Sequence, residues 1–113
     1  MDNGAAMTAD PIRSRFADDP EMREIVAFFV AEVPNRLHEL RQAWSSGDRV
    51  RVRTIAHQMK GAAGGYGFGE IGESAARLEA ALARADRAST PSNDARGAFE
   101  SFVSLLARVT EAG

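Results

Sequence analysis

Residues 53–64 read RTIAHQMKGAAG, and this stretch decides the fold that we expect for the rest of the chain. If it is helical, its apolar side chains recur three and four residues apart, which predicts one buried stripe. The stripe comprises Val52, Ile55, Met59, Ala62 and Tyr66. At about 100° per residue, His57 lies almost opposite the stripe. The sequence therefore predicts a helix that is buried on one side and presents an imidazole on the other.

The predicted solvent face combines His57 with a positive charge and two positions that carry no side chain. Lys60, Gly61 and Gly64 follow His57 on the same side of the helix. A glycine in an exposed helix costs about 1 kcal/mol relative to alanine, so helix stability does not explain either one. Bare backbone beside a nucleophilic side chain lets another surface approach closely.

The composition fits one globular domain and excludes several classes of chemistry. The chain has 113 residues, of which 44% are hydrophobic and 27% charged. A net charge of -2 does not favour binding to nucleic acid. The absence of cysteine removes disulfides, thiolate metal sites and thiol catalysis. Without a membrane-length apolar run of about 20 residues or a secretory signal, we expect a cytoplasmic protein with no membrane contact.

Three further segments repeat the spacing of the central stripe, which predicts a helical bundle. Their seams are Val26, Val30, Val33, Leu37, Leu40 and Trp44; Ile71, Ala75, Leu78, Leu82 and Ala85; and Ala95, Phe99, Phe102, Leu106 and Val109. The short connections favour antiparallel neighbours. We therefore expect an all-α, up-and-down antiparallel four-helix bundle over residues 19–113. Residues 1–18 are expected to be a flexible segment that docks a short helical extension through Ile12 and Phe16.

Turn and cap residues set the expected boundaries of the helices. Asp19 and Asp48 are candidate N-caps for the first and the central helix. Pro34 predicts a kink or a break near Val33, because proline inside a helix costs about 3 kcal/mol. The glycine-rich residues 64–69 should end the central helix, and Thr90-Pro91 should begin the last one.

The solvent face favours a phosphoryl carrier over other histidine chemistry. A neutral imidazole is a good nucleophile near pH 7, and a cation such as Lys60 offsets the charge of an added phosphate. A metal site is disfavoured because Lys60 would repel the ion and His57 has no second ligand at helical spacing. No Gly-x-x-x-x-Gly-Lys-Ser/Thr loop is present, so we expect no enzyme that uses ATP. Kinase activity must then come from a partner.

These residues also resemble a known family, the histidine-containing phosphotransfer (HPt) domains of bacterial phosphorelays. That family's pattern is His-x-x-Lys-Gly, a glycine six residues further, and Leu-Glu on the next helix. Residues 57–61, Gly67 and residues 78–79 match it in spacing. Phe28-Phe29, Pro34 and Gly47-Asp48 are similar to the family's first helices, and the resemblance covers about residues 20–109. The glycine-rich stretch 61–68 is similar to the phosphorylated domain of chemotaxis histidine kinases.

The resemblance implies roles for individual residues and partners. His57 would be phosphorylated, Lys60 would stabilise the phosphate, and Glu79 would orient His57 through its other ring nitrogen or else be an exposed glutamate. Gly61, Gly64 and Arg53 would meet the partner, and Arg49 and Arg53 are equally well explained as solvated arginines. The implied partners are receiver domains of a response regulator and of a hybrid histidine kinase. Mg²⁺ would be held by the receiver and no cofactor by this chain, which we expect to be a monomer.

Two other functions stay open on the sequence alone. One is a chemotaxis-type substrate domain that a separate kinase module phosphorylates directly. The other is a non-catalytic helical adaptor in which His57 is incidental. His38 is expected to be a surface residue, and Trp44 and Tyr66 are expected at the core or its rim.

Overall fold

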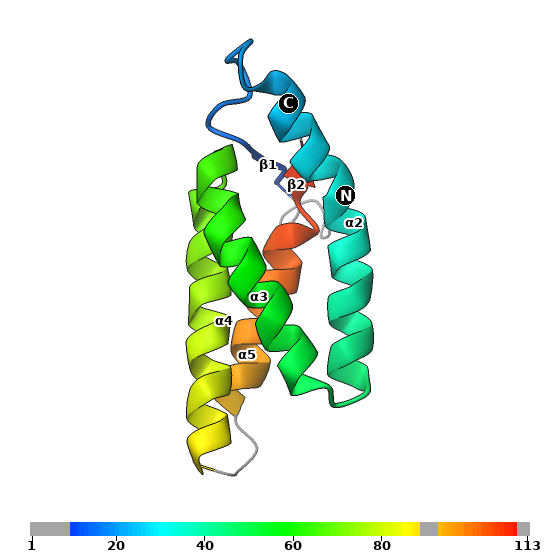
Figure 1. Ribbon diagram of the computed structural model, residues 1–113, viewed down its shortest axis with the longest axis vertical. Coiled ribbons are helices and arrows are strands. Elements are labelled where there is room, and N and C mark those ends of the chain that lie inside the picture. The colour runs from blue at the N-terminus through cyan, green and yellow to red at the C-terminus, as the bar shows by residue number, and fades with distance from the viewer. Residues whose placement is uncertain (1–9, 89–92, 111–113) are drawn as a thin grey trace, which may run out of the picture.

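Four helices form the bundle in the computed structural model, which describes residues 10–88 and 93–110 (Figure 1). They are α2 (Arg23–Ser45), α3 (Arg49–Ala63), α4 (Gly69–Ala88) and α5 (Asn93–Leu106). A single 3₁₀ turn, η1 (Gly64–Tyr66), connects α3 to α4. Two short strands, β1 (Ile12–Arg13) and β2 (Val109–Thr110), pair in parallel. The predicted helical bundle is confirmed, and no helix in the described ranges is long and apolar enough to cross a membrane.

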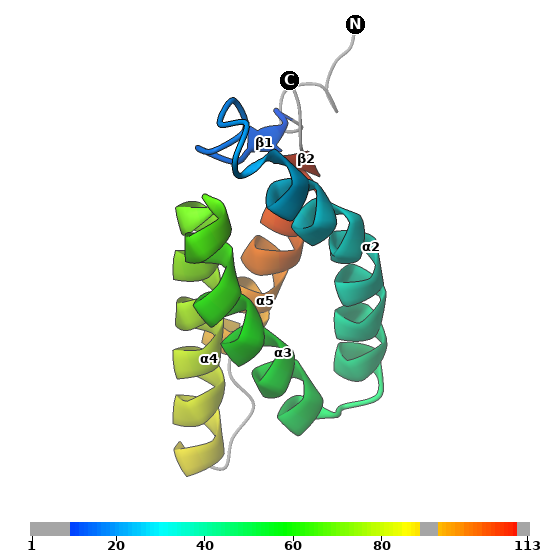
Figure 2. The same cartoon turned by 45° about the horizontal axis from the view of Figure 1, so that its top comes forward.

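The helices pack in chain order around one core. The most extensive contacts join α3 to α4 and α4 to α5, while α2 contacts α3 and, less extensively, α5 (Figure 2). Each helix contributes large side chains that are almost fully buried: Val26, Leu40, Val52, Ile55, Ile71, Leu78, Leu82, Phe102 and Leu106. The predicted seams therefore identify most of the core. Trp44 and Tyr66 are partly buried at its edge, as expected.

Of the kink or break predicted at Pro34, the break is not found, because α2 continues through the proline from Arg23 to Ser45. Apolar side chains on both sides of Pro34 are buried, including Phe29 and Val33 before it and Leu40 after it. Full burial of one such side chain is worth about 1.5–3 kcal/mol, so together they outweigh the cost of the proline. The ribbon of α2 changes direction along its length, so the proline helix is continuous but not straight (Figure 1).

The structure confirms one of the two predicted N-caps, and the other helix begins later in the chain than predicted. The Asp48 side chain accepts a hydrogen bond from the Arg51 backbone nitrogen at 3.0 Å, which caps α3 as expected. Asp19 accepts from the Glu21 nitrogen at 2.9 Å, but it closes a turn, and α2 begins only at Arg23. The start predicted at Thr90-Pro91 lies outside the described residues, and α5 is described from Asn93.

The N-terminal helical extension is not found within residues 10–18. Instead, Ile12 and Arg13 pair with Val109 and Thr110, and the Ile12 nitrogen donates to the Arg108 carbonyl at 2.6 Å. Residues 15–18 form turns. We call residues 10–16 the strap, since they cross the end of the bundle beside β2 (Figure 2). Ile12 and Phe16 do pack against the core, as predicted, but from an extended segment. Periodicity could not reveal strands of two residues, and residues 1–9 lie outside the described part.

Candidate functional site

The two faces of α3 are as different as the sequence predicts. Val52, Ile55 and Met59 are buried against the other helices, whereas His57 faces solvent with 66% of its side chain exposed. The buried stripe runs through Ala56 and Ala63 rather than through Ala62, which is only partly buried. The imidazole is therefore accessible near the middle of a helix that the core holds in place.

Glu79 of α4 reaches across to His57. Its Oε2 lies 2.9 Å from His57 Nδ1, and its Oε1 lies 2.7 Å from Lys60 Nζ. One carboxylate therefore contacts both His57 and Lys60. Of the two arrangements left open for Glu79, the structure has the one in contact with His57.

The charge of Glu79 determines which ring nitrogen of His57 carries hydrogen. The hydrogen bond from Lys60 lowers the pKa of the Glu79 carboxyl below its ordinary value of 4.5; burial opposes this shift and the bond to His57 reinforces it. The carboxylate is ionised at neutral pH and can only accept hydrogen bonds. The His57 Nδ1 must then be the donor, and in the neutral ring the lone pair is on Nε2.

Gly61 and Gly64 are exposed, and nothing in the described fold requires them to be glycine. A Cβ built at either position meets no heavy atom within 4 Å. The backbone of Gly64 is helical, at φ -61° and ψ -40°, so a side chain there would not be strained. The two positions leave open space around His57 at a cost in helix stability.

Gly72 is a residue of the site region that the sequence reasoning missed. A Cβ at this position of α4 would lie 3.5 Å from the Lys60 carbonyl oxygen and 3.8 Å from the Gly64 nitrogen, so the backbones of α3 and α4 approach closely here. Gly72, Glu79 and Asp86 are seven residues apart, which places them on one face of α4. That heptad spacing was the available signal for the side of α4 that meets α3.

Arg53 has a partner within the bundle. Its guanidinium lies 3.1 Å from Asp86 Oδ2, and Arg49 lies 3.5 Å from Oδ1 of the same carboxylate. The two arginines thus connect α3 to α4 on the helical turns before His57. A contact of Arg53 with a partner protein stays a prediction.

A groove between α2 and α3 borders the face of α3 that carries His57, and we call it the α2–α3 groove. It has a volume of about 170 Å³ and is lined by Phe28, Phe29, Glu32, Val33, Arg36, Gln58, Met59, Ala62 and Tyr66. Phe28 is 72% exposed and is the largest of the exposed apolar side chains in the described residues, which also include Ile25 and Val50. The sequence reasoning did not predict this exposure, although Phe28 falls outside the seam of α2.

Other predicted features are placed as follows. His38 is exposed on α2, as expected. Within residues 10–88 and 93–110, no three His, Asp or Glu side chains lie close enough to hold a metal ion.

Of three comparisons with known proteins, one found a match. The family model described as the Hpt domain matches residues 24–111. A search of curated proteins and a search of solved structures each found no match. The matched range contains all of α2 but its first residue, α3, α4 and α5, together with His57, Lys60 and Glu79. The chain therefore belongs to the Hpt domain family, whose members carry phosphoryl groups on histidine in two-component signalling.

Proposed function

We propose that this protein carries a phosphoryl group on Nε2 of His57 between receiver-domain aspartates, from a hybrid histidine kinase to a response regulator. The observation that carries the proposal is the contact of His57 Nδ1 with the ionised Glu79 at 2.9 Å. It engages one ring nitrogen and leaves the lone pair of the other on an exposed imidazole.

The transfer step follows from this arrangement. The Nε2 lone pair attacks the phosphorus of an aspartyl phosphate, the N–P bond forms, and the P–O bond to the aspartate breaks, so that the aspartate leaves as a carboxylate. The Nδ1 proton stays on the ring, and the Glu79 carboxylate offsets the positive charge that develops there. Transfer to the second receiver is the reverse of these events on another aspartate.

Lys60 supplies the cation for the phosphoryl oxygens. Its Nζ is 2.7 Å from Glu79 in the unphosphorylated protein, and its side chain is 41% exposed, so it has freedom to move. A phosphoryl group on His57 brings new negative charge to the same helical face. We propose that Lys60 then shares its hydrogen bonds between Glu79 and the phosphate, which stabilises charge during transfer.

The face around His57 suits a receiver domain. The open positions at Gly61 and Gly64 allow backbone to approach the imidazole, and the α2–α3 groove offers exposed Phe28 as an apolar contact. The receiver would contribute Mg²⁺ and the acidic residues that hold it. We propose that the protein works with these partners as a monomer in the cytoplasm.

We also propose that the four helices run up and down, each antiparallel to the next. The support is the packing of successive helices on one another and the brevity of the connections at 46–48 and 64–68. This order brings Glu79 of α4 beside His57 of α3, because adjacent antiparallel helices share a long contact.

Phosphotransfer from a labelled receiver tests the proposal. The wild-type protein should acquire an acid-labile, base-stable phosphoryl group, and His57→Gln should acquire none. Because His57 is exposed, this variant should keep its helical circular dichroism and change stability by less than about 0.5 kcal/mol. His38→Gln is the matched control on the other histidine and should label like wild type. Undiminished labelling of His57→Gln would overturn the assignment.

The same experiment separates the alternative functions. A chemotaxis-type substrate domain would be labelled by a separate ATP-binding kinase module faster than by any receiver. The glycine-rich stretch after His57 favours including that module in the assay. A non-catalytic adaptor would take label from neither source.

A further inference from the structure

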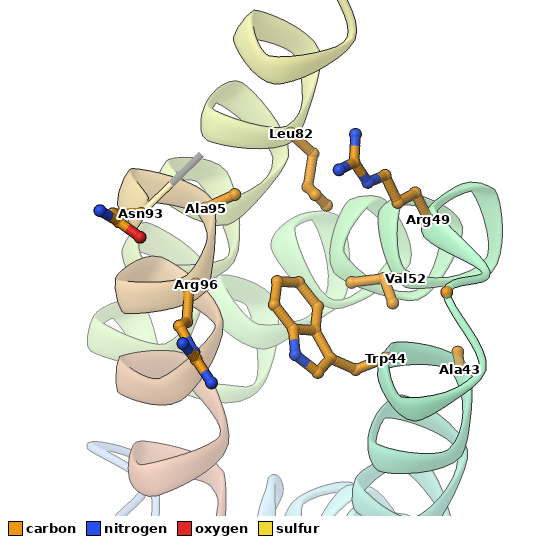
Figure 3. Close-up of a pocket in the computed structure, with 9 residues that line it drawn as sticks. Ala43, Trp44, Arg49, Val52, Leu82, Asn93, Ala95 and Arg96 are labelled. Carbon is orange, nitrogen blue, oxygen red and sulfur yellow. The ribbon is translucent and has the colours of Figure 1, made fainter. Parts of the chain in front are cut away.

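A second candidate site lies at the end of the bundle away from the strap. There the last residues of α2 and the first residues of α3 meet α4 and the start of α5, and they enclose a pocket of about 340 Å³ (Figure 3). This volume is within the range of about 300–1,000 Å³ that is typical of small-molecule sites. His57, Lys60 and Glu79 are not among its lining residues.

The walls of the pocket are apolar and well ordered by packing. Ala43, Val52, Leu82 and Ala95 line it and are themselves buried. The indole of Trp44 lies among them, between α5 and α3 in Figure 3. Trp44 stacks on Phe99 with 4.3 Å between ring centroids and 11° between planes, so the neighbouring helix fixes its orientation. The pocket thus presents a rigid aromatic wall to an incoming group.

The charged side chains that line the pocket are both cations. Arg49 and Arg96 are among the described lining residues, and none of those residues is a carboxylate. The present ion pairs of both arginines are long and exposed: Arg49 lies 3.5 Å from Asp86, and Arg96 lies 3.8 Å from Glu100. Such pairs are worth about 0–1 kcal/mol, so either guanidinium is free to turn towards a ligand. Asp86 would keep its shorter contact with Arg53, at 3.1 Å.

We propose that this pocket binds small aromatic carboxylates. The ring would lie against Trp44 and the apolar walls, and the carboxylate would pair with the guanidinium of Arg49 or of Arg96, which lie on opposite sides of the indole (Figure 3). Guanidinium matches a carboxylate with two parallel hydrogen bonds, and an aromatic ring gains from both burial and the indole. The inference is independent of the phosphotransfer role of His57.

Trp44 is the only tryptophan of the chain, so its fluorescence reports on this pocket directly. The probe is 3-phenylpropionate, which does not absorb where tryptophan is excited selectively, and the matched neutral control is 3-phenylpropanamide. We expect a saturable change of Trp44 emission with a Kd on the order of 0.1–1 mM for a ligand of this size. The amide should bind at least about tenfold more weakly, because it lacks the charge-assisted bonds.

Variants locate the binding and test its charge. The double variant Arg49→Gln/Arg96→Gln should weaken binding of the carboxylate about tenfold and leave that of the amide unchanged. Arg84→Gln removes the same charge from a position of α4 that does not line the pocket, and it should bind like wild type. In nuclear magnetic resonance spectra, the methyl groups of Val52 and Leu82 should shift with the same Kd.

Three results would overturn the proposal. They are a titration without saturation in both fluorescence and methyl shifts, equal affinity for the carboxylate and the amide, and a double variant that binds like wild type. The second result would indicate a merely apolar cavity. None of the three changes the expectation that His57 is phosphorylated.

Discussion

Glu79 holds the ring of His57 and the ammonium of Lys60 at the same time, which gives one residue control over two parts of the proposed chemistry. The sequence alone offered only the Leu78-Glu79 pair of the family pattern and could not say where its carboxylate lies. The distances of 2.9 Å to His57 and 2.7 Å to Lys60 make its removal a sharp test.

Glu79→Gln should change the tautomer of His57 and slow its phosphorylation. With the carboxylate gone, nothing holds the proton on Nδ1 so strongly, and the fraction of ring with a free Nε2 lone pair falls. Nitrogen chemical shifts of the neutral imidazole should show less Nδ1–H in the variant than in wild type. Glu73→Gln, an exposed change on the same helix, is the control and should leave the tautomer as it is. An unchanged tautomer together with an unchanged transfer rate would refute the positioning role.

The effect of Glu79→Gln on the unfolding free energy should depend on pH. The folded-state pKa of Glu79 is lowered from 4.5, so the folded protein favours the ionised carboxylate. Its contribution to stability is present above pH 4.5 and is lost as the pH falls through the folded-state pKa. The difference in unfolding free energy between wild type and Glu79→Gln should therefore shrink as the pH falls below 4.5, as urea titrations at several pH values would show.

At the scale of elements, the last turn of α3 and the start of η1 each carry a glycine on the face of His57, at a cost in helix stability. Gly61 and Gly64 have open space where a side chain would be, so the fold gains nothing from either. Gly61→Ala should raise the unfolding free energy by up to about 1 kcal/mol, since alanine favours the helix.

Gly64→Arg should fold as well as wild type but slow phosphotransfer strongly, because its side chain stands where a receiver would approach. Calorimetric affinity for the receiver should fall in parallel with the rate; wild-type binding and transfer by Gly64→Arg would exclude this face as the docking surface.

The elements also show why sequence reasoning succeeded for α3 but could not decide between a kink and a break in α2. In α3, no residue within the apolar stripe opposes the helix, and the Asp48 cap lies next to the first helical residue in the sequence. The apolar spacing and the cap therefore predict the same helix. In α2, the local penalty of Pro34 competes with burial on both sides of it, and only the tertiary structure shows that burial outweighs the penalty. The packing of Gly72 against α3 and the exposure of Phe28 depend likewise on how helices meet, which spacing within one helix does not specify.

At the scale of the whole molecule, the strap pairs with β2 near the other end of the described chain and also contacts the turn that follows α3. The Ser14 hydroxyl donates to the Tyr66 carbonyl at 2.5 Å, and the Arg15 nitrogen donates to the Gly67 carbonyl at 2.9 Å. Ser14 is buried, with 4% of its surface exposed. The Ser14 and Tyr66 positions are 52 residues apart in the sequence, so no local pattern predicted this contact. Because the strap lies against the turn, it decides at which glycine of the turn a side chain would fit.

Gly67 is the glycine that the strap makes indispensable, in contrast to its neighbour Gly65. Gly67 has φ +86°, and a Cβ there would collide with Ser14, Arg15 and Phe16, whereas a Cβ at Gly65 meets nothing within 4 Å. Gly67→Ala should therefore lower the unfolding free energy by about 1–3 kcal/mol, the combined cost of a left-handed alanine and a displaced strap. Gly65→Ala is the matched control and should be neutral or slightly stabilising.

Hydrogen exchange tells whether the loss in Gly67→Ala arises at the strap. The amides of Ile12 and Arg15, which donate to Arg108 and Gly67, should exchange faster relative to core amides of α4 in Gly67→Ala and at the wild-type ratio in Gly65→Ala. Because the strap lies beyond the turn and away from the Glu79 contact of His57, phosphotransfer per folded molecule should be the same in both variants. Equal stability of the two variants would mean that the strap yields to a side chain at Gly67 without cost. A selective loss of transfer in Gly67→Ala would instead mean that the strap and the turn hold α3 and α4 in the register that brings Glu79 to His57.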